Sequence, residues 1–124
     1  MVLIAKKIFR SFACAFQGLR EAFRRDLSFR LEVFAGVFVA LFAWYFSPLR
    51  AYEFLFLALG YALILIAELI NTAFEQALER LHPERHELIG VSKDIASGAV
   101  FFAVVFMVLV AGVIVLRVYP LSNG

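Results

Sequence analysis

The stretch LILIAELINTAFEQALER, residues 63–80, decides how this sequence folds. It begins as an apolar run that suits a bilayer, but it continues through Glu68, Asn71, Glu75 and Glu79. A helical residue advances about 100° around the axis, so side chains seven and eleven positions after Glu68 return to within about 20° of it, and one three positions on lies about 60° away. The spacing therefore predicts one polar stripe on an otherwise apolar helix.

The composition of the whole chain is that of a membrane protein. Hydrophobic residues make up 64% of its 124 residues, 15 phenylalanines among them, and the mean hydropathy is +0.90. Soluble domains contain only about 45–50% apolar residues. The length leaves room for one domain, so we expect residues 1–124 to form a single unit.

Three apolar segments predict three membrane-spanning helices, at about residues 31–48, 53–75 and 95–117. The hydrocarbon core of a bilayer needs roughly 20 apolar helical residues, with a range of about 17–25. The third segment meets this requirement by itself, and the first meets it narrowly. The second meets it only with Glu68 and Asn71 inside it or at its boundary, which requires these side chains to face protein or water.

The N-terminal segment, about residues 4–27, is typical of a basic amphipathic helix. Seven of the 12 Lys and Arg residues precede residue 31. A basic arm can bind nucleic acid, but this one leads directly into an apolar segment, so we expect a membrane-surface role and no nucleic-acid partner. An ordinary packed helix is the alternative. Apolar side chains recur at steps of three and four, as an interfacial helix requires: Ile8, Phe12, Phe16, Leu19 and Phe23.

The basic residues also predict an orientation. The N-terminal arm is rich in them, and the predicted loop at about 79–94 carries Arg80, Arg85 and Lys93, whereas the turn at 47–53 and the C-terminal tail carry one Arg each. Basic segments stay in the cytoplasm by the positive-inside rule. We therefore expect the N-terminus and the 79–94 loop on the cytoplasmic side.

The polar residues have ordinary explanations as well as functional ones. A carboxylate at the depth of Glu68 is costly, so it must be protonated, paired or functional. Glu75 can pair with an Arg at the headgroups, Asn71 can hydrogen-bond between helices, and Asp26 can pair with Arg30. The sequence has no P-loop, GxGxxG, CxxC or HExxH motif. A nucleotide would therefore have to be held through a carboxylate-bound metal and basic side chains.

Two longer stretches resemble the small bacterial membrane diacylglycerol kinase family, which includes undecaprenol kinases. They are AELINTAFEQALER with the following HPERHELIGVSKDIASGAV, and the N-terminal FACAFQGLREAFRRDLSFRLE. The resemblance covers about residues 7–118 and implies an all-α homotrimer in the bacterial cytoplasmic membrane, each subunit with an N-terminal surface helix and three spans. It also implies transfer of the γ-phosphate of ATP to a lipid hydroxyl, with Mg²⁺.

The resemblance further implies roles for individual residues. Glu68 matches the general base, with Asn71 supporting it, and Asp26 and Glu75 match two metal ligands. The family usually has Glu at position 26, so the carboxylate here is shorter by one methylene, and Cys14 stands where an aromatic contact can occur. The positions that match nucleotide contacts are Lys7, Cys14, Asp26, Glu75, Glu84, Arg85, His86, Lys93 and Asp94. Those that match lipid contacts are Arg20, Glu32, Trp44, Glu68 and Ser97.

The leading hypothesis for function is phosphorylation of diacylglycerol to phosphatidic acid, and undecaprenol is the alternative acceptor. The triplet HEL at 86–88 favours the diacylglycerol branch. A proton-coupled transporter would also use a membrane Glu, but the small multidrug type has four spans where this sequence offers three. An inactive structural subunit is a third possibility, which binding of ATP and Mg²⁺ through Glu75 would exclude.

Overall fold

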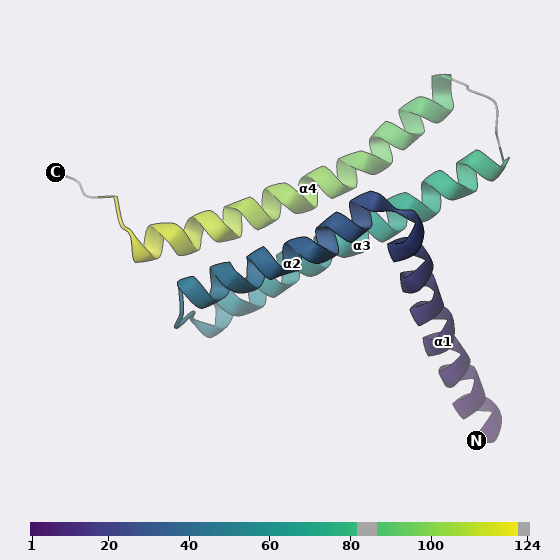
Figure 1. The fold of residues 1–124 in the computed structure, drawn as a ribbon, viewed down its shortest axis with the longest axis horizontal. Helices are drawn as coiled ribbons and strands as arrows, with labels where there is room; N and C mark the ends of the chain where they lie inside the picture. Colours follow the sequence, from purple (N-terminus) through teal and green to yellow (C-terminus); the bar gives the residue numbers. More distant parts are fainter. Residues whose placement is uncertain (82–86, 122–124) are drawn as a thin grey trace.

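The computed structural model describes residues 1–81 and 87–121, and within these ranges the regular elements are all helices. They are α1 (Val2–Arg25), α2 (Leu27–Tyr45), α3 (Ala51–Leu81) and α4 (Glu87–Val118). Helices α2 and α4 each pack against α3, whereas α1 leaves this bundle at a steep angle (Figure 1). The predicted all-α class is confirmed.

Three of the helices are long and apolar enough to cross a bilayer. Helices α2, α3 and α4 contain 19, 31 and 32 residues. At 1.5 Å per residue even the shortest is about 28 Å long, close to the thickness of the hydrocarbon core. Each of the three overlaps one predicted span.

The predicted loop at 79–94 is too long, because α4 already begins at Glu87. Apolar residues every three or four positions between 88 and 95 continue the pattern of the segment that follows, and this extends α4 toward its N-terminus. Lys93 and Asp94 therefore stand on a helix within α4 and not in a loop.

A glycine allows α3 and α4 to approach each other closely. A Cβ added at Gly60 would lie 2.8 Å from Sδ of Met107, so α4 crosses α3 where α3 has no side chain. Leu57 on α3 and Ile114 on α4 are also buried. Helices in a membrane associate mainly through such close packing, because lipid offers no hydrophobic driving force between them.

Tyr61 fixes α2 on α3. Its hydroxyl lies 3.1 Å from the carbonyl oxygen of Glu32 and 2.9 Å from that of Val33, both on α2. The tyrosine reaches these carbonyls by passing over Gly36, where a Cβ would overlap the hydroxyl. This contact sets the height at which α2 presents the side chain of Glu32.

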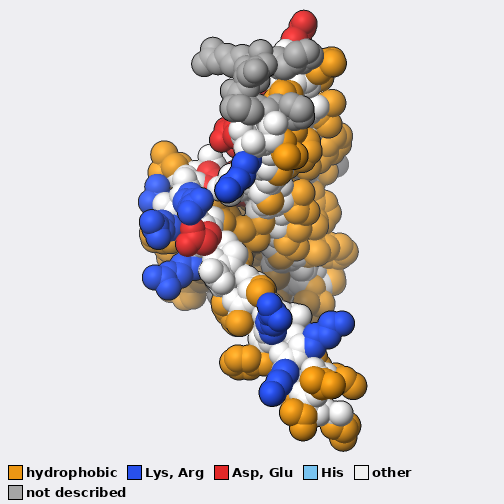
Figure 2. Space-filling model, turned by 90° about the vertical axis from the view of Figure 1, so that its right-hand side faces the viewer, with side chains coloured by type: hydrophobic (Ala, Val, Ile, Leu, Met, Phe, Trp, Pro, Cys, Tyr) orange, Lys and Arg blue, Asp and Glu red, His pale blue; other side chains and the backbone are white. Residues whose placement is uncertain are grey.

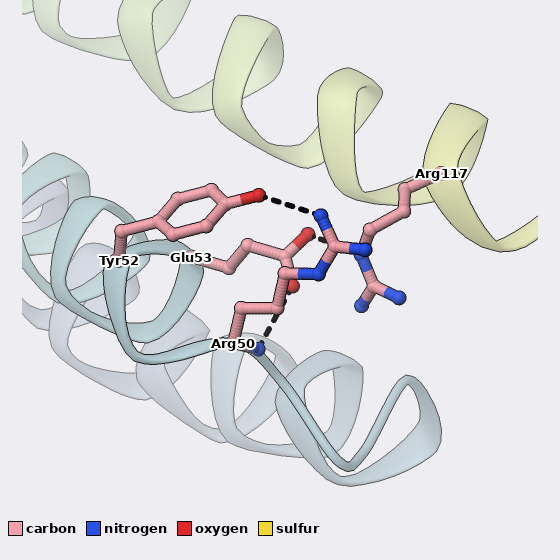
Figure 3. Close-up of polar contacts among 4 residues, drawn as sticks. All are labelled: Arg50, Tyr52, Glu53 and Arg117. Carbon is pink, nitrogen blue, oxygen red and sulfur yellow. Dashed lines mark hydrogen bonds and ion pairs between the residues drawn. The ribbon is translucent and has the colours of Figure 1, made fainter.

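An ion pair joins the start of α3 to the end of α4, at what we call the turn end of the bundle (Figure 3). Nε of Arg117 donates to Oε2 of Glu53 at 2.6 Å, and the backbone N–H of Arg50 donates to Oε1 of the same carboxylate at 2.9 Å. Nη1 of Arg50 donates to the Tyr52 hydroxyl at 2.9 Å. Glu53 is only 3% exposed, so its carboxylate is buried, while the side chain of Arg117 is 27% exposed.

Most apolar side chains of the single chain are not covered by protein. Phe38 and Phe102, for example, are 74% and 75% exposed. Figure 2 shows Lys and Arg side chains spread over the projecting α1 and around its junction, while hydrophobic side chains cover much of the remaining visible face. The buried hydrophobic residues of the described ranges are Ala22, Phe29, Leu57, Ala103 and Ile114. Lipid or further protein must therefore cover the outside of the bundle.

Candidate functional site

A cavity with an unusual density of carboxylates lies near the end of the bundle where α1 meets α2, which we call the junction end. Its volume is about 440 Å³. Three apolar residues of α4 line it together with polar side chains from α2, α3, α4 and the α1–α2 junction. The polar lining residues are Asp26, Ser28, Glu32, Glu68, Asn71, Glu75 and Ser97. We refer to it as the acidic cavity.

Helix α3 supplies three of these side chains through the spacing noted in the sequence. Glu68 and Asn71 are 6% and 7% exposed, and Glu75 is half-buried. Because all three line the acidic cavity, the prediction that they share one face is confirmed. Glu79 is not part of the lining, and its carboxylate instead accepts a hydrogen bond from Nζ of Lys93 at 3.2 Å.

Asp26 stands between two helices, as the one residue separating α1 from α2. Its Oδ1 accepts a hydrogen bond from the backbone N–H of Ser28 at 3.0 Å, so Asp26 is the N-cap of α2. Its Oδ2 accepts a hydrogen bond from the hydroxyl of Thr72 on α3. No ion pair between Asp26 and Arg30, the ordinary explanation considered above, occurs in the described part of the chain.

Glu32 comes from α2 and brings a further carboxylate to the cavity. Its Oε2 is buried and has no hydrogen-bond partner among the described residues. The resemblance placed Glu32 near the lipid, and the structure places it in the same cavity as the proposed base and metal ligands. The carboxyl group of Glu68 interacts electrostatically with three others: Asp26, Glu32 and Glu75. Four neighbouring acidic groups repel one another when charged, and either a bound proton or a bound cation relieves that repulsion.

The ligand set fits a metal ion that arrives together with phosphate. Within residues 1–81 and 87–121, no group of three or more His, Cys, Asp or Glu side chains is arranged to hold a metal without other ligands. Mg²⁺ is usually bound through one or two carboxylates, substrate phosphates and water. Asp26 and Glu75, which line one cavity, meet that requirement.

The other predicted contact residues lie outside the acidic cavity. Lys7, Cys14 and Arg20 are exposed on α1, and Asp94 is exposed on α4. Trp44 is at the opposite end of α2, about 27 Å from Asp26 at 1.5 Å per residue. Lys93 is paired with Glu79. Three predicted nucleotide contacts lie outside the described residues: Glu84, Arg85 and His86.

Sequence reasoning missed two polar residues of this site: Ser28, which lines the acidic cavity, and Thr72, whose hydroxyl bonds to Asp26. Thr72 follows Asn71 directly, and a hydroxyl in an apolar helix is a weak signal because it can bond to its own backbone. Nothing local indicates that the partner of Thr72 lies 46 positions earlier in the chain.

An apolar groove adjoins the acidic cavity. It lies between α3 and α4 and has a volume of about 560 Å³. Asn71 borders both spaces, and its Oδ1 is buried without a hydrogen-bond partner among the described residues. A polar side chain thus stands where a charged cavity meets an apolar one.

The structure is that of a membrane protein. It has three helices long and apolar enough to cross a bilayer, and a cavity lined by four carboxylates lies between them near one end. Residues 13–115 match the family model described as prokaryotic diacylglycerol kinase. The chain belongs to the prokaryotic diacylglycerol kinase family. The predicted resemblance is confirmed, and the chain therefore groups with lipid kinases and not with the transporters considered above.

Individual relatives carry the same name. The chain is 36% identical to a diacylglycerol kinase of Synechocystis over 114 residues. The aligned region covers 91% of this chain and 65% of that protein. It is 32% identical over 96 residues to a diacylglycerol kinase of Haemophilus influenzae, covering 77% of this chain and 80% of the relative. The diacylglycerol kinase of Escherichia coli strain K12 is 30% identical over 103 residues, with 83% and 84% covered. The chain thus spans slightly less than two thirds of the Synechocystis relative.

Proposed function

We propose that this protein phosphorylates diacylglycerol to phosphatidic acid, with ATP as the phosphoryl donor and Mg²⁺ as the metal. The observation that carries the proposal is that Asp26, from the α1–α2 junction, and Glu68 and Glu75, both from α3, line one cavity between the apolar helices. The names of the relatives support diacylglycerol as the acceptor.

The depth of each carboxylate supports a division of labour. Glu68 lies seven residues before Glu75 on α3, so it stands about 10 Å from Glu75 along the helix axis, on the side of the turn end. Glu68 is therefore suited to accept the proton of a lipid hydroxyl. The hydroxyl oxygen then bonds to the γ-phosphorus of ATP, and ADP leaves. The apolar groove beside Asn71 suits the acyl chains of such a lipid. Phosphoryl transfer requires mainly positioning and charge stabilisation, and a bound Mg²⁺ would supply positive charge to the phosphates.

The remaining predicted contacts belong to the same proposal. Asp26 and Glu75 would hold the metal, and Lys93 and Asp94 would face the nucleotide from α4. In the proposal, α1 lies in the membrane interface on the cytoplasmic side of the bacterial inner membrane, with Lys7 near the nucleotide and Arg20 near the lipid. The proposal includes the homotrimer that the resemblance implies, and the exposed apolar surfaces of α2, α3 and α4 are available for contact with lipid or with other copies.

A phosphoryl-transfer assay tests the proposal. Purified protein in lipid vesicles would be incubated with radiolabelled ATP and, separately, with diacylglycerol or undecaprenol. We expect label in phosphatidic acid, and label in undecaprenyl phosphate alone would change the acceptor to the alternative. Absence of transfer to either alcohol would refute a lipid kinase activity.

The variant Glu68→Gln tests the base. Removing a general base typically costs about 10²–10⁴-fold in rate, and we expect a loss in kcat of this order. Glu21→Gln is the matched control, because Glu21 lies on α1, outside the acidic cavity, and pairs with Arg25. A Glu68→Gln protein with near-normal kcat would rule out proton transfer to Glu68.

A further inference from the structure

The hydroxyl of Thr72 makes a contact that the proposed function leaves unexplained. Thr72 is buried in α3, 9% exposed, and donates to Oδ2 of Asp26, which stands 46 positions earlier between α1 and α2. A threonine inside a helix normally bonds to the carbonyl four residues before it. Here the hydroxyl bonds to a carboxylate of the acidic cavity instead.

Both oxygens of Asp26 thus have a donor from the chain. Ser28 donates its backbone N–H to Oδ1, and Thr72 donates to Oδ2. A carboxylate oxygen can accept about two hydrogen bonds or ligand bonds. Besides these two donors, Asp26 also contacts the carboxyl group of Glu68, so the oxygens keep at most one further acceptor site each, and the two donors fix the plane in which these sites lie. The carboxylate is held from α2 on one side and from α3 on the other.

We propose that Thr72 is a positioning residue that orients the Asp26 carboxylate toward the acidic cavity, so that its remaining acceptor sites face Glu75 across the metal-binding space. The inference rests on the proposed function, in which Asp26 and Glu75 share a metal ion. Orientation by Thr72 matters most for a short side chain, because Asp has one methylene less than Glu and can adjust the position of its carboxylate less. Partners of this kind behind a metal ligand typically contribute 10–100-fold to metal affinity or activity.

Thr72 also has a structural role that the test must separate. It lines the space between α1 and α3, next to Leu69 and Ala73. Loss of the Thr72 side chain can therefore weaken the packing of α1 on α3 without any effect on Asp26. Thr72→Val keeps the shape of the side chain and removes the hydroxyl, whereas Thr72→Ser keeps the hydroxyl.

The test measures metal binding and metal dependence in parallel. Mn²⁺ replaces Mg²⁺ as a paramagnetic probe, and its binding to the protein with a non-hydrolysable ATP analogue is followed by electron paramagnetic resonance. We expect Thr72→Val to weaken Mn²⁺ binding about tenfold and to raise the Mg²⁺ concentration for half-maximal rate by a similar factor, with the KM for lipid unchanged. Thr72→Ser should stay within about twofold of the parent. Ser11→Ala, which removes a hydroxyl that bonds to a backbone carbonyl on α1, is the control.

A double-variant comparison identifies the partner. In an Asp26→Asn background, Thr72→Val should cause no further loss of Mn²⁺ affinity, because the carboxylate that it orients is gone. An equal loss in both backgrounds would overturn the inference, and so would a lower melting temperature with unchanged Mn²⁺ binding. These outcomes are distinct from failure of the proposed function, which is absence of phosphoryl transfer by the parent protein.

Discussion

At the scale of single residues, charge repulsion is the main physical problem of the acidic cavity. Glu68 is buried and interacts with three neighbouring carboxyl groups. Asp26 is the best supported of them, since it accepts hydrogen bonds from Ser28 and Thr72. Glu32 has a buried oxygen without a partner in the described residues. A metal ion bound between these carboxylates would relieve this repulsion, so metal dependence should respond to each charge removed.

Glu75→Gln should raise the Mg²⁺ concentration needed for half-maximal rate by at least about tenfold. Residues that merely support a ligand contribute about 10–100-fold, and a direct ligand should contribute no less. The measurement is the initial rate as a function of free Mg²⁺ at saturating ATP, with Glu21→Gln as the charge-matched control on α1. An unchanged Mg²⁺ requirement would remove Glu75 from the metal site.

At the scale of helices, α3 is the element against which the others are placed. Tyr61 attaches α2 to it, Gly60 admits α4, and the Glu53–Arg117 ion pair closes the turn end. These contacts lie in the first half of α3, whereas the acidic cavity is lined by residues of its second half. Substitutions of Glu53 or Arg117 at the turn end should therefore alter stability while leaving metal dependence unchanged.

Tyr61→Phe should destabilise the packing of α2 on α3. The variant keeps the ring and loses a hydrogen bond to the α2 carbonyls, which in membranes contributes about 0.6–1 kcal/mol. Unfolding in mixed micelles, followed by circular dichroism, would measure the loss. Tyr52→Phe is the control, because its hydroxyl accepts from Arg50 at an exposed position. Equal stabilities of the two variants would show that the Tyr61 hydroxyl contributes little.

Arg117→Ala should lower the stability of the protein more than replacing both members of the ion pair with uncharged residues. Without the guanidinium, the Glu53 carboxylate stays buried with no cation beside it other than Arg50 in the described contacts. Removing one partner of a buried pair is strongly destabilising, while replacing both with uncharged groups is often tolerated. Melting temperatures should therefore fall for Arg117→Ala and recover in the Glu53→Gln/Arg117→Met double variant. A double variant below the single one would contradict this account.

At the scale of the whole molecule, the chain combines a charged junction end, apolar walls and a projecting basic helix (Figure 2). This distribution supports the proposed orientation with α1 at the cytoplasmic surface. Cys14 provides a direct probe, because it is the sole cysteine of the sequence and is exposed on α1. It stands seven positions after Lys7, so the two share the basic side of the helix.

A membrane-impermeant maleimide should label Cys14 in inverted membrane vesicles and leave right-side-out vesicles unlabelled. The control is a Cys14→Ser/Ser47→Cys protein, whose thiol lies in the turn between α2 and α3 and should show the opposite pattern. Labelling of Cys14 in right-side-out vesicles would reverse the proposed orientation.

The sequence predicts features of this molecule that depend on one helix at a time. Composition indicates the apolar helices, and the spacing of Glu68, Asn71 and Glu75 indicates their common face, because both follow from the geometry of a single helix. Contacts between helices are not predictable in this way. Thr72 and Glu53 bond to partners 46 and 64 positions away, and these pairings depend on how the helices pack. Glu53 in particular resembles an ordinary polar residue at the edge of an apolar segment.

The junction between α1 and α2 is a single residue, and that residue carries one of the carboxylates of the acidic cavity. The tilt of a membrane-spanning helix adjusts to the thickness of its host bilayer. Because Asp26 alone connects the two helices, a change in the tilt of α2 would alter both the orientation of α1 and the position of the Asp26 carboxylate in the cavity. In the proposed function, the lipid would then act on turnover in two ways, as the reactant and as the medium whose thickness sets the alignment of the proposed catalytic groups.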